Sequence, residues 1–286
     1  MLLMRQDTGR LSAVAVTMEK MIQAVAQRDR LVVGVALVGI AGVAWYYLAH
    51  EAEKFAATGV CQCAAMMIGG PDLAPWSPQT LLPLFLMWAE MMVAMMLPAV
   101  TPLVLLFSKV ARARAERGQP YVSTAFFVSG YFAVWTAFSV GAAVAQWVLH
   151  GTALLSPQMT ASSSILSGAL LVTAGAFQFS PLKSACLAHC RSPLTFLMTN
   201  WSDGRTGAFL MGWKHGWFCT ACCWLLMLLL LVVGVMNLLW IALLALFALS
   251  ERVAPKAWRL SQISGLVLLG AGMWLLAAPL FGSGRS

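Results

Sequence analysis

Residues 211–224 read MGWKHGWFCTACCW, and they continue directly into the apolar run LLMLLLLVVG at positions 225–234. The combined segment is long enough to cross a bilayer, because a transmembrane helix needs about 20 mainly apolar residues. The whole chain shares this character, since 60% of its 286 residues are hydrophobic and only 10% are charged. A soluble domain carries about 25% charged residues. The sequence therefore predicts an all-α fold, a polytopic transmembrane helical bundle, in which the net charge of +8 reflects topology rather than nucleic-acid binding.

The hydropathy pattern divides the chain into about seven predicted membrane spans. They are 31–49, 81–107, 122–149, 163–180, 208–233, 236–250 and 261–281, of which the sixth is the shortest. Cytoplasmic loops of membrane proteins collect Lys and Arg. A cytoplasmic N-terminus places fifteen of the 18 Lys and Arg residues on the inner side and leaves only Lys54 and Arg285 outside. Six spans would break this pattern, so we predict seven spans with the C-terminus outside.

The segments around these spans complete the predicted organisation. Residues 1–30 have apolar side chains at helical spacing, which predicts a cytosolic amphipathic helix before the bundle of residues 31–286. The segment 50–80 is the only sizeable outer loop, and 181–206 is an inner loop that contains Cys and His. Ser180-Pro181 and Ser192-Pro193 have the chemistry that starts helices, so two short interfacial helices are expected within 181–206.

One face of the opening segment carries four candidate metal ligands. Successive helical residues turn by about 100°, which puts all four on an arc of about 100°. The four are His215, Cys219, Cys222 and Cys223. A single membrane cysteine is often a small buried hydrophobe, but thiolates together with imidazole suit Cu(I) and Zn(II). The adjacent Lys214 either extends to the lipid headgroups or favours the thiolate form of a neighbouring cysteine.

A second cluster precedes this segment on the same inner side. In the predicted helix after Pro181, three donors at positions i, i+3 and i+4 share one face. The three are Cys186, His189 and Cys190. An accidental Cys-x-x-His-Cys match is the alternative. Because one helix cannot surround a metal ion, we predict that both clusters contribute ligands to a single site.

The second predicted span contains a methionine-rich stretch, FLMWAEMMVAMMLPAVTP at 85–102. Two stripes at helical spacing consist of Met87, Met91 and Met95, and of Met92 and Met96. Thioethers bind Cu(I) without deprotonation, so these stripes could pass a soft ion through the bilayer, although methionine also simply fills gaps in packing. Glu90 lies near the first stripe, and a carboxylate within a span is costly and usually functional. It could carry a proton, bind the ion or pair with Lys214.

The outer loop holds the remaining two cysteines, Cys61 and Cys63, followed by Met66 and Met67. A Cys-x-Cys pair with nearby methionines could capture a soft ion outside the membrane. It could equally be a redox pair or have no chemical role. The sequence does not decide between these three interpretations.

Three stretches together resemble a bacterial family of predicted metal-binding integral membrane proteins, classed as a domain of unknown function. They are Trp88 with AMMLPAVTP at 94–102, PLKSACLAHCRSPLTF at 181–196, and MGWKHGWFCTACCWLLMLLLLVVGVMNLLW at 211–240. The resemblance covers about residues 80–280 and implies a multi-span fold in a bacterial inner membrane. The matching positions are Met95, Met96, Cys186, His189, Cys190, His215, Cys219, Cys222 and Cys223. Glu90 and the Cys61/Cys63 loop lie outside this pattern.

The leading functional hypothesis is a soft-metal membrane protein that binds or moves copper, with zinc as the alternative metal. Its expected partners are the lipid bilayer and a membrane or periplasmic protein, and no nucleic acid. A second hypothesis is an enzyme, a thiol-disulfide oxidoreductase using the Cys-x-x-Cys of Cys219 and Cys222. A third is a non-catalytic subunit whose polar clusters dock a partner. We favour a non-enzymatic role.

Overall fold

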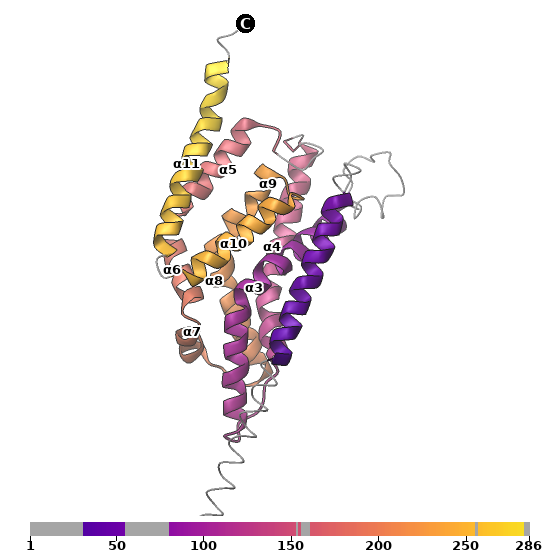
Figure 1. Cartoon of the computed structure of the whole chain (residues 1–286), viewed down its shortest axis with the longest axis vertical. Helices are drawn as coiled ribbons and strands as arrows, with labels where there is room; N and C mark the ends of the chain where they lie inside the picture. The colour runs from indigo at the N-terminus through magenta and orange to yellow at the C-terminus, as the bar shows by residue number, and fades with distance from the viewer. Residues whose placement is uncertain (1–30, 55–79, 153, 156–160, 255–256, 283–286) are drawn as a thin grey trace, which may run out of the picture.

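The computed structural model describes residues 31–54, 80–152, 154–155, 161–254 and 257–282, almost all of which are helical. A first helix spans Leu31–Lys54. It is followed by α3 (Leu81–Ala115), α4 (Thr124–Gly151), α5 (Ser164–Phe177), α6 (Pro181–Arg191), α7 (Pro193–Asn200), α8 (Gly204–Leu228), α9 (Leu230–Val233), α10 (Leu238–Val253) and α11 (Ala257–Gly282). The all-α prediction is confirmed (Figure 1). The predicted helix in 1–30 and the Cys61/Cys63 loop lie outside the described residues.

All seven predicted spans coincide with helices, but not all of these helices are long enough to cross a bilayer alone. Within the described residues, five have the required length and apolarity: Leu31–Lys54, Leu81–Ala115, Thr124–Gly151, Gly204–Val233 and Arg259–Ala278. The 14-residue α5 reaches that length only together with α6, which is bent from it by 64°. The 16-residue α10 falls short of the length of about 20 residues that a span needs. The structure therefore supports five or six spans, and seven remains a prediction.

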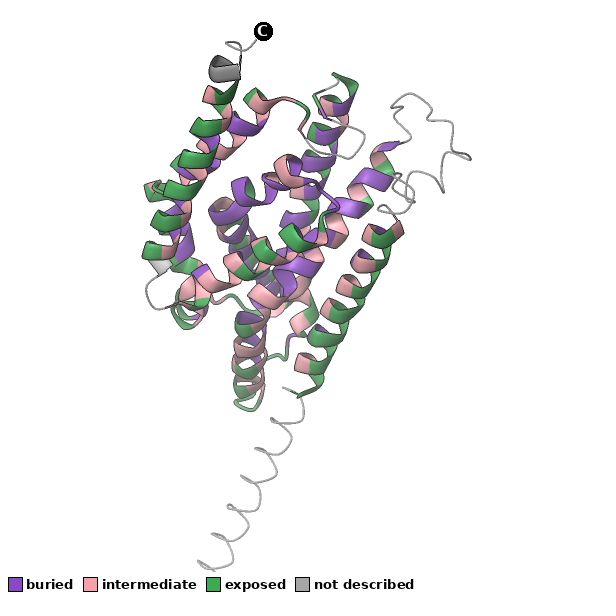
Figure 2. Cartoon of the chain, turned by 45° about the horizontal axis from the view of Figure 1, so that its top comes forward, coloured by how far each residue is buried: buried purple, intermediate pink, exposed green. Residues whose placement is uncertain are grey.

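Burial separates central helices from peripheral ones. Figure 2 shows buried residues concentrated in α3, α4 and α8, whereas the first helix and α11 are largely exposed. The exposed side chains of these two helices are mainly apolar, for example Val35, Val38, Leu266 and Val267. Apolar surface of this kind is compatible with lipid, where it carries no hydrophobic penalty.

Glycine lets α4 and α8 approach each other closely. A Cβ atom at Gly130 of α4 would lie 2.0 Å from the carbonyl oxygen of Phe209. One at Gly212 of α8 would lie 1.9 Å from the carbonyl oxygen of Phe127. Small residues at such crossings allow helix backbones to touch in membrane proteins. This close contact sets Tyr131 of α4 against the cysteine face of α8.

The two short helices expected in 181–206 are present as α6 and α7. The Ser180 hydroxyl accepts a hydrogen bond from the backbone N–H of Leu182, and Pro181 occupies the first turn, as predicted. Ser192 precedes α7 but makes no capping hydrogen bond through its side chain. α6 packs against α8 rather than lying alone on a surface, and its Cys186 and Leu187 are buried.

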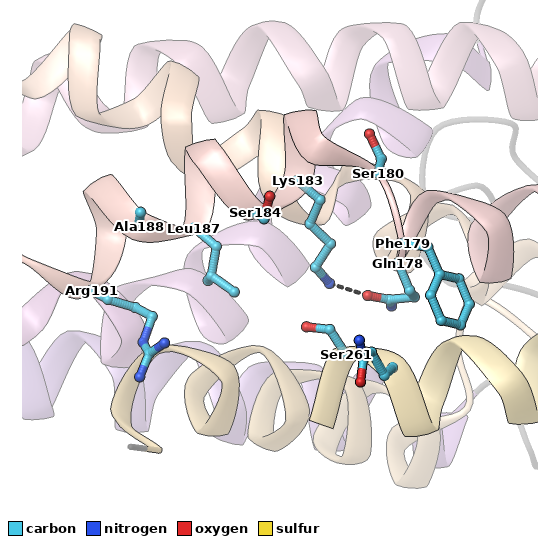
Figure 3. A pocket seen from close by; sticks show the side chains of 10 residues that line it. Gln178, Phe179, Ser180, Lys183, Ser184, Leu187, Ala188, Arg191 and Ser261 are labelled. Carbon is cyan, nitrogen blue, oxygen red and sulfur yellow. Dashed lines mark hydrogen bonds between the residues drawn. The ribbon is translucent and has the colours of Figure 1, made fainter. Parts of the chain in front are cut away.

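Two cations that were counted as inner-loop charges make contacts within the bundle, with Lys183 buried and Arg252 partly buried. The Lys183 ammonium, 1% exposed, donates to both carboxylate oxygens of Glu251 at 2.7 and 2.9 Å and also to the Gln178 side chain (Figure 3). Arg252 lies among sulfur atoms of α8. The number of Lys and Arg residues that face the cytoplasm in the predicted inner loops is therefore smaller by two. Lys183 and Arg252 are excluded because the end of α10 packs against α6, α8 and α11.

Candidate metal centre

The predicted ligand face of α8 points into the bundle. His215, Cys219, Cys222 and Cys223 are all at most 3% exposed. Lys214, one position before the histidine, is exposed and donates a hydrogen bond to the Asn200 side chain of α7. It therefore contacts a polar neighbour at the end of the bundle. The contacts of Lys214 do not include a thiol, and they do not include Glu90.

The α6 cluster lies against the α8 cluster. The side chains of Cys190 and Cys222 lie close enough for their thiols to interact, and so do those of Cys186 and Cys222. The His189 ring stacks on Phe218 of α8 with centroids 4.2 Å apart. The structure thus brings two sequence clusters, about 30 residues apart in the chain, into direct contact.

Two groups that the sequence analysis did not select converge on Cys219. The Tyr131 hydroxyl lies 2.9 Å from the Cys219 sulfur. A terminal nitrogen of Arg252 donates to the same sulfur at 3.0 Å and also lies 3.9 Å from that of Cys223. The sequence carries one weak signal for Arg252, a charged Glu-Arg pair that directly ends a short apolar run. It carries none for Tyr131, which has no motif around it.

Of the five methionines singled out in α3, one lies near a side chain that also contacts the cysteine sulfurs. All of Met87, Met91, Met92, Met95 and Met96 are at most 2% exposed. The Met96 thioether lies 3.8 Å from the Arg252 nitrogen that binds Cys219. α3 packs mainly against α4, where the Trp88 indole donates to the Gln146 side chain at 2.6 Å. Among these five methionines, Met96 is therefore the one that shares a recorded side-chain neighbour, the Arg252 guanidinium, with the cysteines.

Glu90 occupies a different part of the bundle. It lines a largely apolar hollow with residues of the first helix, among them Ile40, Val43 and Tyr47. Its neighbours there are on Leu31–Lys54 rather than on α6 or α8. A role for Glu90 as a ligand of the same ion is therefore not supported by its surroundings.

The donors have the correct chemistry, but their side chains are arranged for hydrogen bonding. In the described part of the chain, no three His, Cys, Asp or Glu side chains converge on a common metal position. The sulfurs of Cys222 and Cys223 instead donate to the Cys219 carbonyl oxygen, each at 3.0 Å. The buried His215 Nδ1 has no hydrogen-bond partner among the described residues.

Comparison with known protein families agrees with this donor set. A family model described as PpoB2, copper chaperone, matches residues 85–275. The chain belongs to this family. The matched region includes the methionines of α3 and both Cys/His clusters. No curated protein and no solved structure matched the sequence.

Proposed function

We propose that this protein is a membrane-embedded copper chaperone that holds Cu(I) between α6 and α8 and transfers it to a partner protein. The observation that carries this proposal is the proximity of the Cys190 and Cys222 thiols, which joins two separate Cys/His motifs. The family description supports an association with copper, and the residues that hold the ion are our inference.

Cu(I) is a soft ion, and thiolate and thioether sulfur are its preferred donors. The residues proposed to hold it are Cys186, Cys190, Cys219, Cys222 and Cys223, with His189, His215 and Met96 at the edge of the cluster. Binding deprotonates the thiols. The hydrogen bonds that the Cys222 and Cys223 thiols donate to the Cys219 carbonyl oxygen would then be replaced by bonds to the ion.

Transfer requires a route by which the ion reaches the partner. Donors shared between α6 and α8 suit stepwise exchange, because α6 is a short helix bent by 64° from α5. The His189 side chain is exposed while it stacks on Phe218, so this imidazole is a ligand that a partner could approach. The methionines Met87, Met91 and Met95 are retained as a proposed path for the ion within α3.

The experiment measures copper bound to the purified protein in detergent under reducing conditions. Wild-type protein should bind Cu(I) at a fixed stoichiometry, and Cys219→Ser, Cys222→Ser and Cys190→Ser should each reduce that binding strongly. The matched control is Ser139→Ala, at a buried polar residue of α4 whose hydroxyl donates to the Trp135 carbonyl. Wild-type protein with no tight Cu(I) site would contradict the proposal.

The same preparations test the oxidoreductase alternative. The Cys190–Cys222 contact would also allow a disulfide between α6 and α8. A thiol-trapping assay should find that these cysteines are reduced, and that bound Cu(I) protects them from the alkylating reagent. A pair that cycles between thiol and disulfide without retaining copper would favour the enzyme.

A further inference from the structure

Arg252 is a permanent positive charge placed directly on the proposed copper ligands. Its guanidinium reaches the sulfurs of Cys219, Cys223 and Met96 at 3.0, 3.9 and 3.8 Å. Arginine stays protonated in proteins. No carboxylate pairs with it within the described residues, since the adjacent Glu251 is bound to Lys183 and Ser261. The Arg252 Nε is also buried and lacks a hydrogen-bond partner in the same part of the chain.

Arg252 is only partly buried, but its guanidinium points at buried sulfur atoms, and a poorly solvated charge without an opposite charge is destabilising. The groups around the guanidinium that can supply one are the cysteine sulfurs, since a thiolate is the form that binds metal. A hydrogen bond to a thiolate occupies one of its lone pairs and leaves others for an ion. Arg252 can therefore stay in place while Cys219 and Cys223 bind a metal.

We propose that Arg252 is the residue that determines the charge of the ion accepted by the site, and that its contacts to Cys219 and Cys223 select a monovalent soft cation over a divalent one. The proposal rests on the proposed function and extends it to ion selectivity. It follows from Coulomb repulsion. A divalent ion beside the guanidinium is repelled twice as strongly as a monovalent ion at the same position, however many thiolates bind it. Without the guanidinium this penalty on the divalent ion would be absent.

The charge difference matters because the site is enclosed. Cys219 and Cys223 are at most 2% exposed, so water cannot screen a surplus charge on the complex. Cu(I) and Zn(II) both accept sulfur and nitrogen donors, and ligand type alone separates them poorly. A fixed cation next to the ligands supplies a discrimination that the donor set lacks.

The test compares the association constants of Cu(I) and Zn(II) by competition with chromophoric chelators, on full-length protein in detergent. Arg252→Gln should lower the ratio of the Cu(I) constant to the Zn(II) constant at least tenfold, which corresponds to about 1.4 kcal/mol. Arg252→Lys should keep the ratio within about threefold of wild type, because lysine retains the positive charge. Arg114→Gln is the matched control, since Arg114 pairs with the exposed Asp203 away from the cysteines.

A second variant keeps the proposal testable if Arg252→Gln does not fold. Cys223→Ser removes one negative charge and should shift the ratio the opposite way, in favour of Cu(I), although both ions bind more weakly. A ratio unchanged in Arg252→Gln, or lowered in Cys223→Ser, would overturn the role of Arg252. If the wild-type protein binds no Cu(I), the proposed function itself is refuted. Failure of the role of Arg252 and failure of the proposed function are therefore distinguishable.

Discussion

At the scale of single residues, the Cys219 sulfur is surrounded by groups that favour its negative form. The Tyr131 hydroxyl and the Arg252 guanidinium both approach it, from α4 and α10 respectively. Such outer groups fix the orientation of a ligand and the charge that it carries. Neither residue belongs to a Cys/His motif, so the chemistry of the motif depends on helices that lie far from it in sequence.

The first prediction concerns Tyr131. Tyr131→Phe keeps the ring that lies 5.9 Å from the His215 ring but removes the hydroxyl at the Cys219 sulfur. We expect Cu(I) affinity to fall roughly 10–100-fold, the usual effect of losing an outer-shell partner. Tyr121→Phe is the control, because Tyr121 is exposed. Equal affinities for wild type and Tyr131→Phe would show that the hydroxyl has no part in ligand positioning.

At the scale of helices, the end of α10 connects four other elements. Glu251 binds Lys183 of α6 and Ser261 of α11, while the next residue, Arg252, contacts α8 and α3. Adjacent residues of opposite charge thus hold α6 and α8 in their relative positions. The contact between the Cys190 and Cys222 thiols depends on that arrangement.

The second prediction breaks this connection from one side. Lys183→Met leaves Glu251 without its cation in a site that is 1% exposed, and we expect a loss of stability of about 3–5 kcal/mol. Thermal unfolding in detergent measures it. The double variant Lys183→Met/Glu251→Leu should recover part of that loss, because no unpaired charge remains. A double variant less stable than the single one would indicate that the ion pair is not the source of the effect.

The third prediction concerns the crossing of α4 and α8. Gly130→Ala would place a methyl group 2.0 Å from the Phe209 carbonyl oxygen, so the helices must separate. We expect lower thermal stability together with weaker Cu(I) binding, since Tyr131 is the next residue. Gly141→Ala in the same helix meets nothing within 4 Å and should be neutral or stabilising by up to about 1 kcal/mol. Similar losses in both variants would contradict the role of close helix contact.

At the scale of the whole molecule, the two ends of the described chain lie at opposite ends of the bundle. The indigo start of the first helix is at one end, and the C-terminal end of α11 is at the other (Figure 1). This arrangement is compatible with an odd number of membrane crossings. Five spans satisfy it, and so do seven spans in which α5 and α6 form one bent span and the short α10 another.

The fourth prediction tests that topology. Reporter fusions at the N-terminus and the C-terminus should locate on opposite sides of the membrane, with the N-terminus in the cytoplasm, because most Lys and Arg lie in the predicted inner loops. Reporters active only outside the cytoplasm should therefore work at residue 286 and fail at residue 1. Both ends on one side would mean that α10 or the α5–α6 pair does not cross.

The sequence by itself determined the class of fold, the approximate helix positions and the two Cys/His motifs, because apolar composition and helical spacing are local properties. It also marked α6 correctly through Ser180 and Pro181, whose cap chemistry acts within one turn. Only the tertiary structure decided which groups surround Cys219, that Lys183 is buried and Arg252 contacts the cysteine sulfurs, and that Met96 lies beside the same guanidinium. These facts depend on helix crossings at Gly130 and on the return of α10, and no local pattern in a single sequence encodes such long-range packing.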